Sequence, residues 1–153
     1  YFTLWVDDNV KEGIVKDIQN NPPFTAVQTI NVNWMSTHPS SYKMLSAHPQ
    51  WKSGIRALEQ SINGKRYLYI PKGEIRNNQL FRNTIKDGDI LLMITRKKGL
   101  DTTHIGIASW HKDGLHLLNA SSIHKKVIDE PMTLYTYMQK HPSQIGVRAC
   151  RVL

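Results

Sequence analysis

The apolar residues in the first part of the chain recur mainly at helical spacing. A group near the start predicts a helix over residues 1 to about 12, which Gly13 can cap at its C-terminal end. A longer helix follows Pro49 and ends near Gly64. The residues that define these two apolar stripes are Phe2, Trp5, Val6 and Val10, and then Trp51, Ile55, Leu58 and Ile62. Because a helical pattern is already running at the first residue, we expect the domain to begin upstream of it.

Alternation of apolar and polar positions predicts strands in the rest of the chain. One half-buried strand lies between the two helices, over residues 26–34. Five further strands follow, and a short helical stretch around residues 132–138 interrupts them. Their ranges are 67–70, 89–95, 104–110, 115–119 and 146–152. Helices gathered in the first half and strands in the second predict an α+β domain with an antiparallel sheet, without the regular alternation of a doubly wound fold.

The composition is that of one folded domain. The chain has 153 residues, of which 40% are apolar, and this is enough to bury a core. Its most apolar run, residues 90–94, is far shorter than the roughly 20 residues that cross a bilayer. We therefore predict a single domain over residues 1–153 that lacks its N-terminal part, and no transmembrane segment.

Charge and cysteine content narrow the range of partners. Twenty Lys and Arg against twelve Asp and Glu give a net charge of +8, which favours nucleic acid, an anionic membrane surface or an acidic cell-wall polymer as partner. The basic residues are scattered, as on an ordinary solvated surface, and no pattern of a nucleic-acid-binding module is present, so we expect no nucleic-acid partner. Cys150 is the only cysteine, which excludes an internal disulfide and a cysteine-based zinc site.

The most informative segment is residues 86–122, where a short turn joins two predicted strands. If residues 111–114 form that turn, His104 and Asn119 lie diagonally on the same sheet face, at the roughly 7 to 8 Å from which an amide reaches an imidazole. A turn formed by the last two of these residues would instead place Asn119 opposite Ala108. The register of the hairpin therefore decides whether the two side chains meet.

A histidine at a strand start with an amide partner has the chemistry for nucleophilic catalysis. One ring nitrogen can take the proton of a thiol while the amide holds the other nitrogen. Gly106 and Ala108 share the face of His104, and both residues are small, which leaves room for another backbone or a substrate to approach closely. The alternative is that His104 is a structural histidine with satisfied hydrogen bonds, and the pattern by itself leaves both interpretations open.

Several motifs occur in an order that resembles a known group of enzymes. GDI at residues 88–90, HIGI at 104–107 and LHLLNASS at 115–122 resemble the NlpC-type cell-wall peptidase superfamily of papain-like cysteine amidases. Over nearly its whole length the chain is similar to one branch, the bacterial N-acetylmuramoyl-L-alanine amidase-like family. The further motifs that carry this resemblance are Tyr1-Phe2-x-x-Trp5 with Asn9, Met35-Ser36-x-His38-Pro39 with Tyr42, Tyr69-Ile70-Pro71-Lys72, Gly99-Leu100-Asp101-x-x-His104 and Gly146-Val147-Arg148.

The resemblance implies a papain-like α+β fold and a hydrolase of the bacterial cell envelope or periplasm that cleaves a peptidoglycan amide bond without a cofactor. His104 takes the position of the catalytic histidine, and Asn119 takes that of the orienting residue, where many relatives carry histidine. The family's cysteine opens a helix before these strands, yet residues 1–103 contain none, and Cys150 resembles a small buried apolar residue. We therefore expect the nucleophile upstream of Tyr1. The alternative is a non-catalytic wall-binding or interaction module that keeps the fold.

Six further residues are candidates for contact with peptidoglycan fragments or stem peptides. They are Asp101, Thr102 and Thr103, which directly precede His104, and Ser36, His38 and Tyr42, which lie in one loop. A polar turn and a loop packed on itself are the alternative interpretations of these two groups. The spacing of the histidines fits no usual zinc pattern, so we expect no metal.

Overall fold

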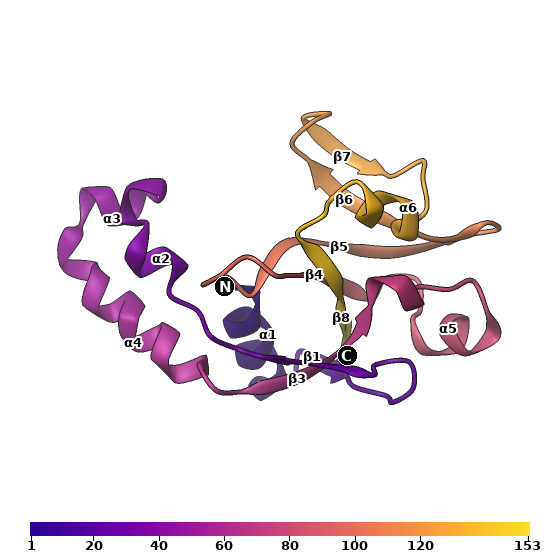
Figure 1. Ribbon diagram of the computed structural model, residues 1–153, viewed down its shortest axis with the longest axis horizontal. Helices are drawn as coiled ribbons and strands as arrows, with labels where there is room; N and C mark the ends of the chain where they lie inside the picture. Colours follow the sequence, from indigo (N-terminus) through magenta and orange to yellow (C-terminus); the bar gives the residue numbers. More distant parts are fainter.

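The computed structural model describes residues 1–153 as one antiparallel sheet with helices on both of its faces (Figure 1). The chain opens with α1 (Phe2–Lys11), and Gly13 follows it at a φ of +73°, which a residue with a side chain rarely adopts. The short strands β1 (Val15–Ile18) and β2 (Ala26–Thr29) come next. The α+β class, the antiparallel sheet and the first helix predicted from the sequence are confirmed.

The strand predicted over residues 26–34 is shorter than expected. β2 ends at Thr29, and Trp34 begins a helix instead of continuing the strand. The cause is a long-range contact, because the backbone N–H groups of Asn33 and Trp34 both donate to the carbonyl of Gly99, at 3.0 and 2.9 Å. These bonds turn the chain away from the sheet.

The next helices form an arm to one side of the sheet (Figure 1). The arm consists of α2 (Trp34–Thr37), α3 (Lys43–Ala47) and α4 (Lys52–Ile62). Short 3-10 turns that begin at Pro39 and Pro49 join them, since proline fits the first turn of a helix. The arm is anchored where Ile62 of α4 packs on Ile30 and Val32. The long helix predicted after Pro49 is confirmed.

The remaining chain supplies most of the sheet. Its elements are β3 (Arg66–Pro71), α5 (Gln79–Thr84), β4 (Ile90–Thr95), β5 (Thr102–His111), β6 (Gly114–Ser121), β7 (Lys126–Asp129), α6 (Leu134–Gln139) and β8 (Gln144–Val152). All five strands predicted in this half are present, but α5 was not predicted, so helices are less confined to the first half than expected. The strand order is β2-β3-β8-β4-β5-β6-β7, and β1 also pairs with β8. None of the helices has the length and apolar character that a membrane span requires.

The two faces of the sheet bury different helices. On one face, Leu134 and Met138 of α6 join a large apolar cluster with Met93, Leu117 and other sheet residues. On the other face, Val6 of α1 packs with Val15, Leu92 and Cys150. Because neighbouring residues of a strand point to opposite faces, this pattern places His104, the partner of Met93 in the ladder, on the face of α6.

The β5–β6 hairpin has the register that brings His104 toward Asn119. Trp110 pairs with Leu115, as the turn at residues 111–114 requires. The turn is tighter than predicted, because His111 and Gly114 still pair and only two residues remain unpaired. The alternative register, with Asn119 opposite Ala108, is wrong, since Ala108 pairs with Leu117.

Candidate active site

His104 near the start of β5 and Asn119 near the end of β6 form a hydrogen-bonded pair. Nε2 of His104 lies 2.9 Å from Oδ1 of Asn119, which confirms the contact expected from the hairpin. An amide oxygen can only accept a hydrogen bond, so the proton of this bond sits on Nε2. In the neutral ring the lone pair is then on Nδ1. His104 therefore offers one nitrogen as a base while Asn119 holds the other.

The pair lies in a polar cleft of about 300 Å³. Tyr137 of α6 faces His104, with 6.3 Å between ring centroids, and stacks at 4.3 Å on His141. Burial and the nearby Glu130 carboxylate raise the pKa of the Tyr137 hydroxyl, so it stays protonated. The cleft is also lined by Lys97, Thr103, Glu130 and Gln144. Cationic, anionic and neutral polar groups thus surround the imidazole.

A second cavity of about 420 Å³ adjoins the cleft and is mainly apolar. Its apolar side chains are Tyr1, Phe2, Trp5, Met35, Tyr42 and Leu100. Thr103 lines both cavities, so they meet at the residue before His104. The Thr103 hydroxyl is buried and has no hydrogen-bond partner within the protein. A buried hydroxyl without a partner is costly, and a bound ligand could supply one.

The N-terminal end of α1 is fixed beside this junction. The buried Asp101 carboxylate accepts a hydrogen bond of 3.0 Å from the backbone N–H of Thr3, in the first turn of the helix. A carboxylate at this place also interacts favourably with the helix dipole. The Tyr1 hydroxyl donates to the buried carboxylate of Glu59 and accepts a bond of 2.8 Å from the N–H of Met35. The first turn of α1 is therefore bonded to Asp101, which directly precedes β5 and lies three residues before His104 in the chain.

The structure brings together four of the six residues that we predicted to contact substrate. Asp101, Thr102, Thr103 and Tyr42 line the apolar cavity. Ser36 and His38 line neither cavity. The Ser36 hydroxyl donates to the carbonyl of Asn33 at 3.1 Å, and the His38 ring stacks on Trp34 at 3.9 Å, so both side chains contact the helical arm.

Several cleft residues were not found from the sequence, among them four from the last part of the chain. Glu130, Tyr137, His141 and Gln144 follow the edge strand β7, far along the chain from His104. Tyr137 and His141 are four residues apart, a spacing that places two side chains on one side of a helical turn and that could have pointed to a pair. Nothing in the pattern around Glu130 and Gln144 indicated that they would reach the cleft.

Cys150 is buried away from the cleft, as predicted. Its side chain has no exposure and packs with Val6 and Leu92 on the face opposite His104. Burial raises the pKa of the Cys150 thiol to about 11, so little thiolate is present at neutral pH. This residue is unsuited to act as a nucleophile.

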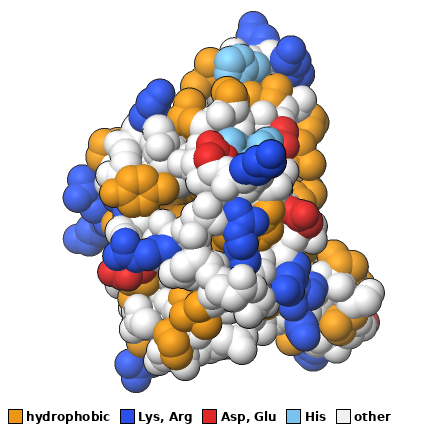
Figure 2. All heavy atoms as spheres, turned by 90° about the vertical axis from the view of Figure 1, so that its right-hand side faces the viewer, with side chains coloured by type: hydrophobic (Ala, Val, Ile, Leu, Met, Phe, Trp, Pro, Cys, Tyr) orange, Lys and Arg blue, Asp and Glu red, His pale blue; other side chains and the backbone are white.

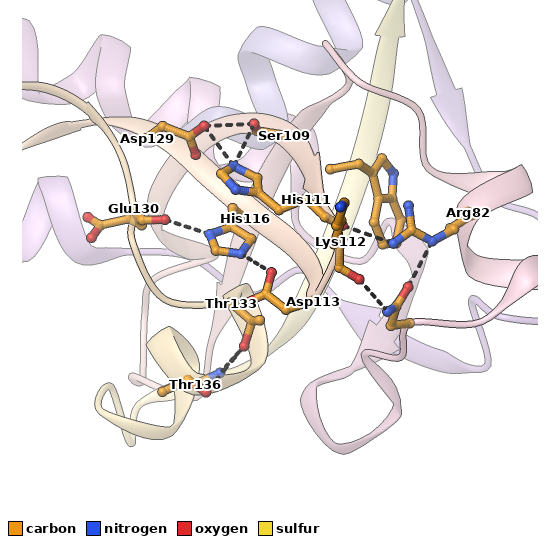
Figure 3. Close-up of polar contacts among 12 residues, drawn as sticks. Arg82, Ser109, His111, Lys112, Asp113, His116, Asp129, Glu130, Thr133 and Thr136 are labelled. Atoms are coloured by element: carbon orange, nitrogen blue, oxygen red, sulfur yellow. Dashed lines mark hydrogen bonds and ion pairs between the residues drawn. The ribbon is translucent and has the colours of Figure 1, made fainter.

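A cluster at the tip of the β5–β6 hairpin contains three side chains of the types that bind metal ions, namely His111, His116 and Asp129. Figure 3 shows His111 beside Asp129, with 2.9 Å between Nε2 and the carboxylate, and His116 beneath it. His116 is buried, and both of its nitrogens face acceptors at 2.6 Å, the Asp113 carboxylate and the Glu130 carbonyl. A ring that bonds two acceptors must carry two protons, and an imidazolium offers no lone pair to a metal. The side chains of this cluster therefore pair with one another and with nearby acceptors, and His116 has no lone pair left for a metal ion.

The basic side chains are dispersed on the face that carries this cluster. Figure 2 shows lysine and arginine in separate groups among uncoloured polar atoms, with a pair of histidines between acidic side chains. No continuous basic stripe follows this face. The arrangement agrees with the interpretation of the charge of +8 as mainly a solvated surface.

The chain resembles proteins of known structure over almost all of its length. It matches crystal structures of an N-acetylmuramoyl-L-alanine amidase from Bacteroides uniformis at 30% identity and a TM-score of 0.91, with 99% of this chain and 63% of that chain covered. A Bacteroides fragilis protein provisionally named a xylanase matches at 32% identity, with a TM-score of 0.90 over 99% of this chain and 65% of that one. A Legionella pneumophila protein shares the fold at 22% identity and a TM-score of 0.61, over 97% and 60% of the two chains.

The chain thus spans less than two thirds of the length of these structures. No curated protein matches it significantly. The profile of the family described as N-acetylmuramoyl-L-alanine amidase-like, or AmiA-like, matches residues 1–147. This match covers the helix α1, the His104–Asn119 hairpin and both cavities, and the chain is a member of the N-acetylmuramoyl-L-alanine amidase-like family.

Proposed function

We propose that this chain supplies the histidine and the amide of a cysteine amidase that cleaves an amide bond of peptidoglycan outside the cytoplasm. The observation that carries the proposal is the His104–Asn119 hydrogen bond, in a cleft that continues past Thr103 to the start of α1. Membership of the amidase-like family supports the reaction class and the substrate.

The nucleophile in this proposal is a cysteine that precedes Tyr1. Cys150 is excluded by its burial on the other sheet face, and no other cysteine occurs in these 153 residues. A thiol placed before the first turn of α1 would lie near the junction of the two cavities. A helix N-terminus also stabilises a thiolate. A thiol at a helix start facing a histidine on an antiparallel sheet is the papain-like, NlpC-type arrangement, and we assign the chain to it on this basis.

Each proton transfer of the proposed reaction can be assigned to one nitrogen of His104. Nδ1 of His104 takes the proton of the thiol, and the resulting thiolate attacks the amide carbonyl carbon. The imidazolium, whose Nε2–H donates to Asn119, then gives its Nδ1 proton to the leaving amine as the carbon–nitrogen bond breaks. Water deprotonated by His104 hydrolyses the thioester that remains and restores the thiol. No further reactant is required.

The two cavities suit a substrate whose halves differ in polarity. The apolar cavity, with Tyr42 and Phe2 in its walls, can pack against a methyl group or the flat face of a sugar ring. The polar cleft can bind peptide carboxylates through Lys97. The unpartnered hydroxyl of Thr103 lies between them, so we assign Thr103 to the scissile amide and Asp101 and Thr102 to the same wall.

The test is hydrolysis of purified muropeptides by the full-length protein, measured as release of free amine. Changing His104 to Ala should lower kcat/KM by about a thousandfold or more, since it removes the base. Asn119→Ala should cost less, because it disturbs orientation and leaves proton transfer possible. Cys150→Ser is the matched control and should retain wild-type turnover. Residues 1–153 alone should not turn over substrate.

A non-catalytic wall-binding module is the second candidate, because no accessible cysteine occurs in residues 1–153. It predicts that the full-length protein binds muropeptides but releases no amine. Turnover by the His104→Ala variant, or by residues 1–153 alone, would contradict the amidase mechanism.

A further inference from the structure

We infer that Glu130 is a positioning residue, which holds the Asn119 amide in one orientation and thereby decides which nitrogen of His104 is the base. The inference deepens the proposed function and rests on the role given there to His104. It concerns a buried acid that lines the cleft and that no sequence motif indicated.

The side-chain amide of Asn119 has an oxygen that accepts hydrogen bonds and an NH2 group that donates them, and the neighbouring groups distinguish the two. Its Nδ2 lies 3.1 Å from Oε1 of Glu130 and 3.3 Å from the backbone carbonyl of Leu117. Both groups accept hydrogen bonds and neither can donate one while the carboxyl is ionised. The NH2 group must therefore face Glu130, and Oδ1 must face His104, where it requires a proton on Nε2.

Glu130 is itself held in place by the strand that carries Asn119. Its backbone N–H donates to the Leu117 carbonyl at 2.9 Å, and its carbonyl accepts from Nδ1 of His116 at 2.6 Å. The residue directly follows β7, which pairs with β6, and it is 6% exposed. The carboxylate is thus fixed relative to the amide that it orients, as a second residue behind a catalytic pair must be.

Without an acceptor at position 130 the amide has little reason to keep this orientation. Rotation by half a turn exchanges Oδ1 and Nδ2, which are almost equal in size, so packing does not resist it. The hydrogen bond to the Leu117 carbonyl is longer than the one to Glu130, and its acceptor is uncharged. Hydrogen bonds to charged groups are about twice as strong as neutral ones. A rotated amide would donate to Nε2 and move the ring proton to Nδ1, which then could not accept a proton from a thiol.

The first measurement is the tautomer of His104, which does not depend on turnover. Histidines of the full-length protein are labelled with ¹⁵N, and His104→Gln assigns the signal. Spectra at about pH 8, above the ordinary pKa of histidine near 6.5, report which nitrogen carries the proton. We expect the Nε2–H form in the wild type, and loss of that preference in Glu130→Met, which keeps the length of the side chain but removes its acceptor.

Three further variants separate geometry from charge and folding. Glu130→Gln keeps an acceptor and should retain the Nε2–H form, whereas Glu130→Asp keeps the charge but is too short and should lose it. Should Glu130→Met fail to fold, Glu130→Asp gives the same comparison. Asp129→Asn is the matched control, because it removes the neighbouring carboxylate, which contacts Ser109 and His111 instead of Asn119.

Turnover of muropeptides adds a second readout. Glu130→Met and Glu130→Asp should lose at least tenfold in kcat with little change in KM, and Glu130→Gln should recover most of that loss. An Nε2–H signal that persists in both Glu130→Met and Glu130→Asp would overturn the inference. A tautomer that changes as expected in a protein without turnover would support the inference while contradicting the proposed function.

Discussion

His116 carries a charge in the interior of the hairpin tip. Burial opposes protonation of its ring, but the hydrogen bonds to the Glu130 carbonyl and to Asp113 outweigh burial, so the pKa of His116 is raised above its ordinary value. A group whose pKa is higher in the folded than in the unfolded protein binds protons preferentially when folded. Its stabilisation is complete below the unfolded pKa of about 6.5 and is lost as the pH rises through the raised value.

The melting temperature should therefore fall as the pH is raised from about 6 to about 9, and His116→Gln should flatten this dependence. Differential scanning fluorimetry over this range measures it. His124→Gln, in the exposed turn after β6, is the control and should keep the wild-type slope. A slope that is the same in all three proteins would mean that His116 is uncharged in the folded state.

The thiol of Cys150 should be protected in the folded protein. A pKa of about 11, against an ordinary 9.0, lowers the thiolate fraction about a hundredfold, and complete burial slows modification further. Reaction with a chromogenic disulfide should be slow in buffer and fast in guanidinium. Fast modification of the folded chain that a muropeptide prevents would contradict the placement of Cys150 outside the active site.

At the scale of elements, β5 and β6 approach so closely at Gly106 that no side chain fits. A Cβ at this position would overlap the side chain of Leu117 and lie 3.0 Å from the carbonyl of Leu118. Of the two interpretations of this small residue, close approach of a neighbouring strand is confirmed, and the space beside Gly106 is not open to a substrate.

Replacing Gly106 by Ala should lower the free energy of unfolding by about 1–3 kcal/mol, the usual cost of overpacking. Gly54 in α4 has open space around it, and Gly54→Ala should raise the free energy of unfolding by roughly 0.5–1 kcal/mol through helix propensity. Chemical denaturation of the two variants provides the comparison. If Gly106→Ala changed the free energy of unfolding by the same amount and in the same direction as Gly54→Ala, Leu117 would have to move aside to make room for the new methyl group.

Sequence periodicity predicted those helices and strands whose conformation is determined by their own residues. β4 is an unbroken apolar run, and α4 has a regular apolar stripe, so both are visible locally. β1 and β7 are four residues long and contain only two apolar residues each, and their strand conformation comes from pairing with β8 and β6. No local pattern contains that information.

The same distinction applies to the candidate site. The sequence predicted the contact of His104 with Asn119 for one of two possible turns, because the turn fixes the register of a hairpin and register fixes which side chains meet. Glu130 and Tyr137 reach the cleft through the packing of α6 and the chain after β7. Ser36 belongs to a motif from which we predicted contact with substrate. Its position instead follows from the bend that the hydrogen bonds to the Gly99 carbonyl impose on the chain.

At the scale of the whole molecule, Arg148 connects the N-terminal segment to the centre of the sheet. Its guanidinium is fully buried and donates to Thr3 of α1 and Asp17 of β1, both at 3.2 Å. It also lies 3.9 Å from the ring centroid of Tyr67 on β3. Burial raises the pKa of Asp17 even beside this cation.

Arg148→Met should destabilise the protein by about 3–5 kcal/mol, because it leaves the Asp17 carboxylate, whose side chain is only 18% exposed, without its partner. The melting temperature should fall by roughly 2–4 °C for each kcal/mol. Adding Asp17→Asn should restore part of the loss. Arg76→Met, which breaks the exposed pair with Glu74, should change stability by less than about 1 kcal/mol. A similar small effect of Arg148→Met would mean that the interior tolerates an unpaired Asp17.

The position of β8 has a consequence for how the protein is made. This strand, residues 144–152, lies between β3 and β4 and also pairs with β1, so it joins the two halves of the sheet. When synthesis has reached residue 143, every other strand has been made, but the partner that β1, β3 and β4 share does not yet exist. Pairing of Val15 with Val152 also joins segments almost the whole chain apart, and such distant contacts slow folding. The two halves of the sheet can therefore join only after synthesis of β8, and until then β3, β4 and β1 present unpaired edges that a chaperone would have to shield.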